Sequence, residues 1–384
     1  MTHSYDVAIL GAGIAGSSLA KWMSDLGWDT VLIDRKSFPR HKVCGEFLSP
    51  EAMGTLEFFG IRELVDRLQP TQITSSQLIF QNGAVLDLAL PGPGIGISRY
   101  LLDMELHKEA ERSGVKLYTK ANVISVHAAD EEYTVVMKQE KEKQALRAKV
   151  VIAAWGANAR SKIASGNMEQ RRQAHSNKYM GVKSHYLGIH MEPVVELYFF
   201  DGGYLGLCPV ENGIVNVAAL LNRKKFTPTD KSIAGLIKEA CRRNPMLEKR
   251  LASAISVPES ETAVAPVDVN RKLLTWDITP LIGDAAVMIP PLCGDGMSMA
   301  LTSAMHCGTL ADRFLRGSIS MEEWRREYSR SLHQQFDGPL RWGRVLQSLF
   351  GIPWLSPVLP VLAHSAPVLT NALLQATRLT NSHS

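Results

Sequence analysis

The sequence predicts an α/β fold, in which a parallel sheet covered by helices carries an inserted mixed or antiparallel sheet and ends in a helical C-terminal region. Three observations predict this. An apolar run at residues 5–10 leads directly into a glycine turn and an amphipathic helical pattern. Alternating apolar segments surround Asn-Gly pairs further along the chain. The last segment is apolar and interrupted by prolines. With 384 residues, 45% of them hydrophobic, the chain can form one large or two interleaved domains.

Composition argues against several classes of protein. The formal net charge of +4 comes from scattered Lys and Arg, so no nucleic-acid partner is predicted. The five cysteines show no CxxC spacing and the N-terminus shows no leader pattern, which together predict reduced thiols and a cytoplasmic location. The histidines show neither metal-ligand nor Ser/His/Asp spacing, so no metal site is predicted.

The first chemical motif is the glycine turn after the first apolar run. Its three glycines, Gly11, Gly13 and Gly16, have the spacing Gly-x-Gly-x-x-Gly. The first allows a tight turn, the second removes a side chain where a pyrophosphate approaches, and the third lets helix and strand pack closely. The helix that begins around Ile14 and Ala15 offers free N–H groups to the anion. This context predicts a Rossmann-like dinucleotide-binding unit.

A second apolar run, "DTVLID", ends in Asp34, at the usual distance of about twenty residues from the glycine turn. A carboxylate at this strand end accepts hydrogen bonds from ribose hydroxyls and repels a 2′-phosphate. The motif therefore favours FAD or NAD over NADP as the bound nucleotide.

A second motif, "LIGDAAVMIPPLCGDGMSMALTSA", indicates which of the two nucleotides, FAD or NAD, is bound. It predicts a short strand ending at Gly283-Asp284, a proline loop, and a helix opened by Gly294, Asp295 and Gly296. A carboxylate at position 284 can bind the ribitol hydroxyls of a flavin. The helix N-terminus can stabilise negative charge on a reduced isoalloxazine. A simple NAD domain needs neither feature, so FAD is the predicted cofactor.

Together with "ISRYLLDMELHKEAERSGV" and "AKVVIAAWGANARSKI", these motifs resemble the flavoprotein superfamily of aromatic hydroxylases, geranylgeranyl reductases and flavin-dependent halogenases, which shares a para-hydroxybenzoate hydroxylase-like fold. The resemblance covers about residues 5–340. It implies that Arg99 lies beside the FAD pyrophosphate and that Asp284 binds ribitol. The further cofactor contacts that it implies are Arg35, Arg40, Cys44, Gly45, Val123, Gly283, Pro291, Gly294, Gly296 and Met297.

The chain departs from parts of this superfamily. Trp155-Gly156 stands where the hydroxylases usually have Asp-Gly, and Val287 replaces a frequent His. The WxWxIP signature of the halogenases is absent, which argues against halogenation.

Cys44 lies in "RHKVCGEFLSP", where geranylgeranyl reductase-like members carry a similar Cys-Gly segment near the flavin. No second cysteine or His/Asp cluster accompanies it, so metal binding is not expected. The flanking Arg40, His41 and Lys42 could activate a thiol for a direct catalytic role. We favour packing of a small residue beside the isoalloxazine. Cys293, in the second flavin loop, is open to the same two interpretations.

The inserted sheet is indicated by Asn82-Gly83 and Asn212-Gly213, each between alternating apolar residues. The segment "ELYFFDGGYLGLCPV" resembles the stretch with which the superfamily covers its substrate cavity. The residues predicted to line a pocket for a small apolar substrate are Tyr198, Phe200, Tyr204 and Leu207.

We expect three regions along the chain. The FAD-binding domain comprises residues 1–75, 99–170 and 271–330, the substrate-binding sheet comprises 76–98 and 171–270, and a helical apolar region comprises 331–384. The prolines at 353, 357, 360 and 367 argue against a membrane span in that last region. It is expected to pack on the domain, or else to make peripheral contact with a membrane or cap a substrate channel.

Three functions fit these features. The preferred one is a monooxygenase that hydroxylates an apolar, aromatic or polyketide-like molecule through a flavin C4a-hydroperoxide, with NADH or NADPH as the transient reductant. The second is a geranylgeranyl reductase-like enzyme that reduces C=C bonds of an isoprenoid or lipid. The third, a lipid-binding scaffold without turnover, is disfavoured by the intact glycine motif and Asp284.

Overall fold

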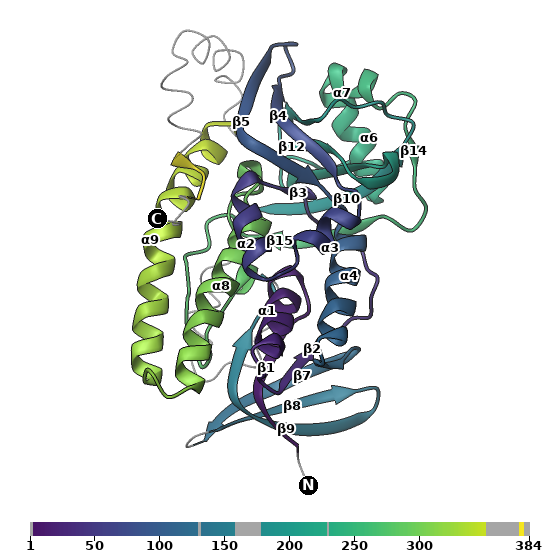
Figure 1. Ribbon diagram of the computed structural model, residues 1–384. Coiled ribbons are helices and arrows are strands. Elements are labelled where there is room, and N and C mark those ends of the chain that lie inside the picture. Colours follow the sequence, from purple (N-terminus) through teal and green to yellow (C-terminus); the bar gives the residue numbers. More distant parts are fainter. Residues whose placement is uncertain (1–2, 130–131, 158–177, 229, 351–375, 380–384) are drawn as a thin grey trace.

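The computed structural model describes residues 3–129, 132–157, 178–228, 230–350 and 376–379. Two sheets organise the chain, one of six strands and one of nine (Figure 1). The mixed α/β architecture confirms the predicted fold class.

The six-stranded sheet has the order β6-β2-β1-β9-β8-β7. Strand β1 pairs in parallel with β2 and β9, and β2 pairs in parallel with β6, whereas β8 is antiparallel to β9 and β7. The strand bounds are β1 Ser4–Leu10, β2 Thr30–Ile33, β6 Lys116–Tyr118, β7 Ala121–Ala129, β8 Glu132–Gln139 and β9 Glu142–Ala153.

Side chains of β1 alternate between two cores, as the pleat of a strand requires. Val7 and Ile9 pack with helices α1 (Ile14–Asp25), α4 (Arg99–Arg112) and α8 (Gly296–Leu315). Ala8 and Leu10 pack with residues of β7, β8 and β9 on the other face. Because both faces of β1 are covered, residues 7–10 form an unbroken apolar run. The predicted first strand, first helix and second strand are confirmed.

The nine-stranded sheet has the order β14-β10-β13-β12-β11-β4-β5-β3, with β15 also paired to β10. It is mixed, because β11 and β4 are parallel while the other pairs are antiparallel. The strand bounds are β3 Phe47–Leu48, β4 Thr71–Ile79, β5 Val85–Gly96, β10 Tyr179–Leu187, β11 Val194–Phe200, β12 Gly203–Pro209, β13 Val215–Asn222, β14 Ile255–Ser256 and β15 Thr262–Val267.

Both predicted Asn-Gly turns connect antiparallel strands of this sheet. Gly83 has φ +82° between β4 and β5. Asn212 and Gly213, in the short turn η2 (Glu211–Gly213), have φ +58° and +68° between β12 and β13. Positive φ in these turns matches the twist of the flanking strands, which explains why Asn and Gly occupy them.

Shorter helices complete the structure. Helices α6 (Ile233–Arg243) and α7 (Pro245–Arg250) pack on one face of the nine-stranded sheet. The turn η1 (Pro50–Ala52) and helices α2 (Met53–Phe58) and α3 (Arg62–Arg67) pack on the first core, which is the apolar cluster that contains Val7, Ile9 and helices α1, α4 and α8. The second flavin motif contains the turns η3 (Gly283–Ala285) and η4 (Pro291–Cys293).

Helix α9 (Met321–Phe350) runs beside α8 (Figure 1). Residues four apart form its buried stripe, as an amphipathic helix requires: Trp324, Tyr328, Leu332, Phe336 and Leu340. The proline-rich segment 351–375, on which the predictions of a packed tail or membrane contact rest, lies outside the described residues. Within the described part of the chain, no helix is long and apolar enough to span a bilayer.

Candidate active site

The glycine turn has the geometry that the motif predicts. Gly11 has φ +117°, and a Cβ added there would overlap the carbonyl oxygen of Ala154 at the end of β9. A Cβ at Gly16 would overlap the backbone of Gly11. Strand β1, the turn and α1 therefore pack too closely for any larger residue at these two positions.

The N-terminus of α1 can accept an anion. Its N-cap residue is Gly13, no side chain caps its N–H groups, and its first turn contains no acidic residue. A guanidinium nitrogen of Arg99 lies 3.6 Å from where a Cβ of Gly13 would be. The helix N-terminus and a buried guanidinium thus face the same point, which is the arrangement that a pyrophosphate requires.

Arg99 is fixed in this position. It is only 3% exposed, and its Nε and Nη2 donate to Asp103 at 2.7 and 2.8 Å. Burial opposes its charge, but Asp103, Cys44 and Asp284 lie close enough to raise the pKa of Arg99 above its ordinary value. The resemblance placed Arg99, Cys44 and Asp284 around one cofactor, and the structure brings these three residues together.

Asp34 ends β2 beside the glycine turn. Its carboxylate accepts hydrogen bonds from the backbone N–H of Ala12 and of Lys36, both at 2.8 Å. Arg40 donates to both oxygens at 2.7 and 2.9 Å. Burial would raise the pKa of Asp34, yet Arg40 and the two backbone donors hold it below its ordinary value. A ribose bound here would have to share the carboxylate with Arg40.

Two further predicted contacts lie near Asp34. Val123 is in β7, whose first residue, Ala121, donates its N–H to the Asp34 carbonyl at 3.0 Å. Arg35 follows Asp34 directly and is exposed. Their contact with FAD stays a prediction.

The second motif folds against the first. The predicted strand before Gly283 is reduced to one parallel bridge between Leu281 and Ala153, because the chain turns at once into η3. That bridge brings Asp284 to the ends of β1 and β9, where Lys42 pairs with its carboxylate at 3.5 Å. The predicted helix is confirmed as α8. Pro291 is exposed in η4, whereas Met297 is buried in the first core.

The loop between η4 and α8 contains a buried acid. Asp295 is 1% exposed, and among the described residues neither of its carboxylate oxygens has a hydrogen-bond partner. Burial, followed by the negative charge of Glu51, raises the pKa of Asp295 to about 7, although Ser49 and Arg378 oppose the rise. This carboxyl therefore changes its charge near neutral pH, at the N-terminus of the helix expected to face the flavin.

Cys44 is half-buried between the two sheets. Its Sγ accepts a hydrogen bond from the Glu46 N–H at 3.4 Å, and its carbonyl accepts one from Asn216 Nδ2 at 3.0 Å. Gly45 is exposed, and a Cβ added there would meet nothing within 4 Å. Hydrogen bonds from Glu46 and Asn216 thus hold Cys44 in place, while Gly45 is exposed to solvent. Within the described ranges, no group of three His, Cys, Asp or Glu residues could hold a metal ion.

The structure adds an ionic cluster that the sequence motifs did not identify. Glu46 is fully buried, and its carboxylate pairs with Lys183 Nζ at 2.5 Å and with His185 Nε2 at 2.7 Å. The same carboxylate accepts the backbone N–H of Arg99 at 2.8 Å. Burial would raise the pKa of Glu46, but His185 and Lys183 hold it below its ordinary value. Burial and the same two partners lower the pKa of His41, next to the cluster, to about 4.

A sequence signal for this cluster did exist. Lys183 and His185 are two residues apart in the strand "YMGVKSHYL", so they lie on one face of β10 among apolar neighbours. A lysine buried in a strand is rare unless it is paired.

The four residues predicted to line a substrate pocket are divided between two apolar clusters. Tyr204 packs in a cluster with Phe199 and also with Met288 and Leu292 of the second flavin motif. Tyr198, Phe200 and Leu207 lie in a second cluster on the opposite face of the sheet, which includes residues of α6, and the Tyr198 hydroxyl donates to Glu196. Because neighbouring side chains alternate across a strand, the four predicted residues cannot share one face. Tyr204 alone therefore packs toward the second flavin motif, and the other three pack toward the layer that contains α6.

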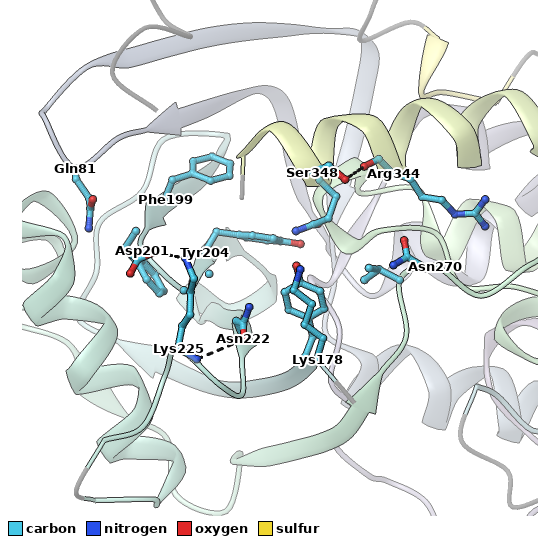
Figure 2. A pocket seen from close by; sticks show the side chains of 16 residues that line it. Gln81, Lys178, Phe199, Asp201, Tyr204, Asn222, Lys225, Asn270, Arg344 and Ser348 are labelled. Atoms are coloured by element: carbon cyan, nitrogen blue, oxygen red, sulfur yellow. Dashed lines mark hydrogen bonds and ion pairs between the residues drawn. The ribbon is translucent and has the colours of Figure 1, made fainter. Parts of the chain in front are cut away.

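One described cavity borders this region. Phe200 and Tyr204 are among the residues that line it, together with residues of α9 (Figure 2). Of the four predicted pocket residues, only Phe200 and Tyr204 line this described cavity.

The residues present fit FAD. The uncapped helix N-terminus, the buried Arg99 and the close approach at Gly11 suit a pyrophosphate. Asp34, bound to the Ala12 N–H, and Asp284, near Arg99, suit the hydroxyls of sugar and ribitol. Fold and site together define an FAD-dependent oxidoreductase.

Comparison with known proteins agrees. The model of the family described as "FAD binding domain" matches residues 4–330, so the chain belongs to that family.

Two curated relatives are reductases. The menaquinone reductase of Mycobacterium tuberculosis is 28% identical over 327 residues, covering 80% of this chain and 77% of the relative. The digeranylgeranylglycerophospholipid reductase of Methanococcus vannielii is 26% identical over 335 residues, covering 85% and 81%.

Solved structures share the fold. A myxobacterial chondrochloren halogenase has a TM-score of 0.78 at 19% identity, covering 90% of this chain and 82% of the other. A geranylgeranyl bacteriochlorophyll reductase-like protein from Thermoplasma acidophilum has a TM-score of 0.76 at 19% identity, covering 97% and 96%. Because the fold is common to halogenases and reductases, the activity must be inferred from the site.

Proposed function

We propose that this enzyme reduces carbon–carbon double bonds of an isoprenoid lipid. The observation that carries the proposal is the Cys44-Gly45 segment, which resembles that of geranylgeranyl reductase-like proteins. Here it lies beside Arg99 and is held by hydrogen bonds to Glu46 and Asn216. The names of the curated relatives support the same chemistry, since a digeranylgeranylglycerophospholipid carries isoprenoid double bonds.

FAD, once reduced, would supply the hydride for such a reaction, and the second hydrogen would be added as a proton from solvent or from an acidic group at the site. The chain contributes position and charge: the N-terminus of α1 and Arg99 would hold the pyrophosphate. The Glu46 cluster fixes the Cys-Gly segment against β10 and α4. The N-terminus of α8 would stabilise negative charge on the ring. NADH or NADPH is the proposed reductant, docking transiently because the chain has a single Gly-x-Gly-x-x-Gly unit followed by an acidic strand end.

The test is product analysis without oxygen. The FAD-loaded protein is reduced with dithionite under argon and mixed with a digeranylgeranyl glycerophospholipid, and the lipid is examined by mass spectrometry. We expect a gain of two hydrogen atoms for each reduced bond. Protein kept oxidised is the control and must leave the lipid unchanged. Unchanged lipid in the reduced sample would contradict the proposal.

Hydroxylation is the second candidate, and a specific observation favours it. Phe80, Phe199 and Tyr204 form an aromatic cluster that packs against Met288 and Leu292 of the second flavin motif. Such a surface suits an aromatic substrate. This candidate predicts that an aromatic substrate gains one oxygen atom, and only in air with NADH or NADPH.

A further inference from the structure

The cavity that includes Tyr204 has a volume of about 340 Å³. It lies between the ends of β11, β12 and β13 that are near Gly203 and the C-terminal half of α9 (Figure 2). Phe199, Phe200 and Tyr204 supply aromatic walls, while Lys178, Asn270 and Arg344 supply polar ones. The volume suits the head group of a lipid or a small molecule.

Three buried polar atoms at this cavity have no hydrogen-bond partner within the described chain: Tyr204 Oη, Gln347 Oε1 and Arg344 Nε. Tyr204 is 5% exposed and Gln347 is 8% exposed, so water does not readily solvate them. Figure 2 shows the Tyr204 ring extending from its strand toward the helix that carries Arg344 and Ser348. A buried polar group without a hydrogen-bond partner destabilises the folded protein. Three such atoms around one cavity indicate a polar ligand.

The charged side chains at the cavity indicate whether that ligand is an anion or a cation. Lys225 pairs with Asp201 at 2.9 Å, which neutralises both. Lys178 and Arg344 have no acidic partner among the described residues, and the guanidinium of Arg344 is oriented by a hydrogen bond from Nη2 to the Arg271 carbonyl at 2.7 Å. The lining thus carries a positive surplus, which favours an anion.

The cavity adjoins the predicted position of the flavin ring. Tyr204 packs in one cluster with Leu292 of η4. Gly343, next to Arg344, is so close to η4 that a Cβ added there would lie 2.8 Å from Cys293 Sγ. A head group held by Arg344 and Tyr204 would therefore place the start of its attached chain at the second flavin loop.

We propose that this cavity binds a phosphate-bearing head group of the isoprenoid substrate, with Arg344 and Lys178 recognising its charge and Tyr204 and Gln347 its hydrogen-bonding groups. The role of this head group as part of a substrate rests on the proposed function. Its binding does not, because binding can be measured without turnover.

Calorimetric titration of the FAD-loaded protein tests the proposal with three probes: geranyl diphosphate, geraniol and inorganic pyrophosphate. We expect geranyl diphosphate to bind at least about tenfold more tightly than either of the others, because only it provides both an anion and an apolar chain. Arg344→Gln and Lys178→Gln should each weaken its binding about tenfold and leave geraniol unaffected. The matched control is Arg341→Gln, an exposed arginine one turn earlier on α9 that does not line the cavity. It should bind geranyl diphosphate like the wild type.

Equal binding of geranyl diphosphate and geraniol would overturn the proposal, as would wild-type affinity in both Arg344→Gln and Lys178→Gln. Equal affinity for inorganic pyrophosphate would also overturn it, by showing a site for free phosphate. The outcome is separable from that of the reductase test. Charge-selective binding without lipid reduction leaves the head-group site standing and contradicts the activity. Lipid reduction that proceeds at the wild-type rate in Arg344→Gln and Lys178→Gln supports the activity and contradicts the head-group site.

Discussion

At the scale of single residues, Asp295 shows how burial sets the chemistry of the site. Its carboxyl is enclosed at the N-terminus of α8, and burial together with the negative charge of Glu51 raises its pKa to about 7. An acid whose pKa is higher in the folded than in the unfolded chain binds more protons when folded. Its stabilising contribution is therefore complete below about pH 4, the ordinary range of an aspartate, and is lost as the pH rises through about 7.

The prediction concerns Asp295→Asn, which removes this titration. Relative to the wild type, the free energy of unfolding of the variant should rise between pH 4 and pH 8 by about 2–4 kcal/mol, as a pKa rise of this size implies. Urea unfolding at saturating FAD across this range measures it. Asp66→Asn, at an exposed carboxylate, is the control and should show no such trend. A difference that stays constant with pH would contradict the assignment.

Cys44 provides a second test on a single side chain. We expect packing to be its role, so Cys44→Ala should keep kcat for lipid reduction within about tenfold of the wild type. Removing a general acid would instead cost about 10²–10⁴-fold. Single-turnover reduction of the lipid by pre-reduced enzyme measures this step. A loss in the larger range, with FAD affinity unchanged, would assign the proton transfer to the thiol and contradict a packing role.

At the scale of elements, the unit β1–turn–α1 creates the anion site. Gly11→Ala would force a side chain into the carbonyl of Ala154 at a φ of +117°, a backbone conformation that L side chains rarely adopt. Strain of this kind costs about 1–3 kcal/mol, so we expect FAD to bind about 10–100-fold more weakly. Gly338→Ala, in α9 directly before Pro339, is the control, since a Cβ there meets nothing within 4 Å outside its chain neighbours and its φ is not positive. Fluorescence titration with FAD measures both variants, and unchanged affinity in Gly11→Ala would contradict the assigned geometry.

The elements that could be predicted from sequence are those with local causes. Strand β1, helix α1 and the turns at Gly83 and Gly213 follow from patterns within a few residues. The sequence could not show that Tyr204 lies on the opposite face from Tyr198, Phe200 and Leu207, because the side of a strand that faces the cofactor depends on which layers cover it. Those layers come from α6 and from residues distant in sequence.

The Glu46 cluster escaped prediction for a related reason. Glu46 and its partner Lys183 are 137 residues apart, so only the tertiary structure brings them together. Asp34, Arg99 and Asp284 could be placed around one cofactor in advance because their motifs had a known spatial relationship, which the resemblance supplied.

At the scale of the whole molecule, this buried cluster joins the two sheets. Glu46 binds Lys183 and His185 of β10, in the nine-stranded sheet, and the first N–H of α4, which covers the six-stranded sheet. Glu46→Gln would leave Lys183 without its counter-charge, and breaking a buried pair in this way costs about 3–5 kcal/mol. Asp66→Asn, which breaks an exposed pair with Arg62, should cost no more than about 1 kcal/mol. Urea unfolding measures both variants, and a loss for Glu46→Gln as small as that of the control would show that the cluster does not hold the sheets together.

The central claim is that electrons pass from FAD to an isoprenoid double bond. The most direct measurement follows flavin absorbance in a stopped-flow instrument after reduced enzyme is mixed, without oxygen, with a digeranylgeranyl glycerophospholipid. We expect the absorbance of oxidised flavin to return, at a rate that rises with lipid concentration, and the saturated analogue of the lipid to give no return. Flavin that stays reduced in the presence of the lipid and is reoxidised only by oxygen would contradict the claim.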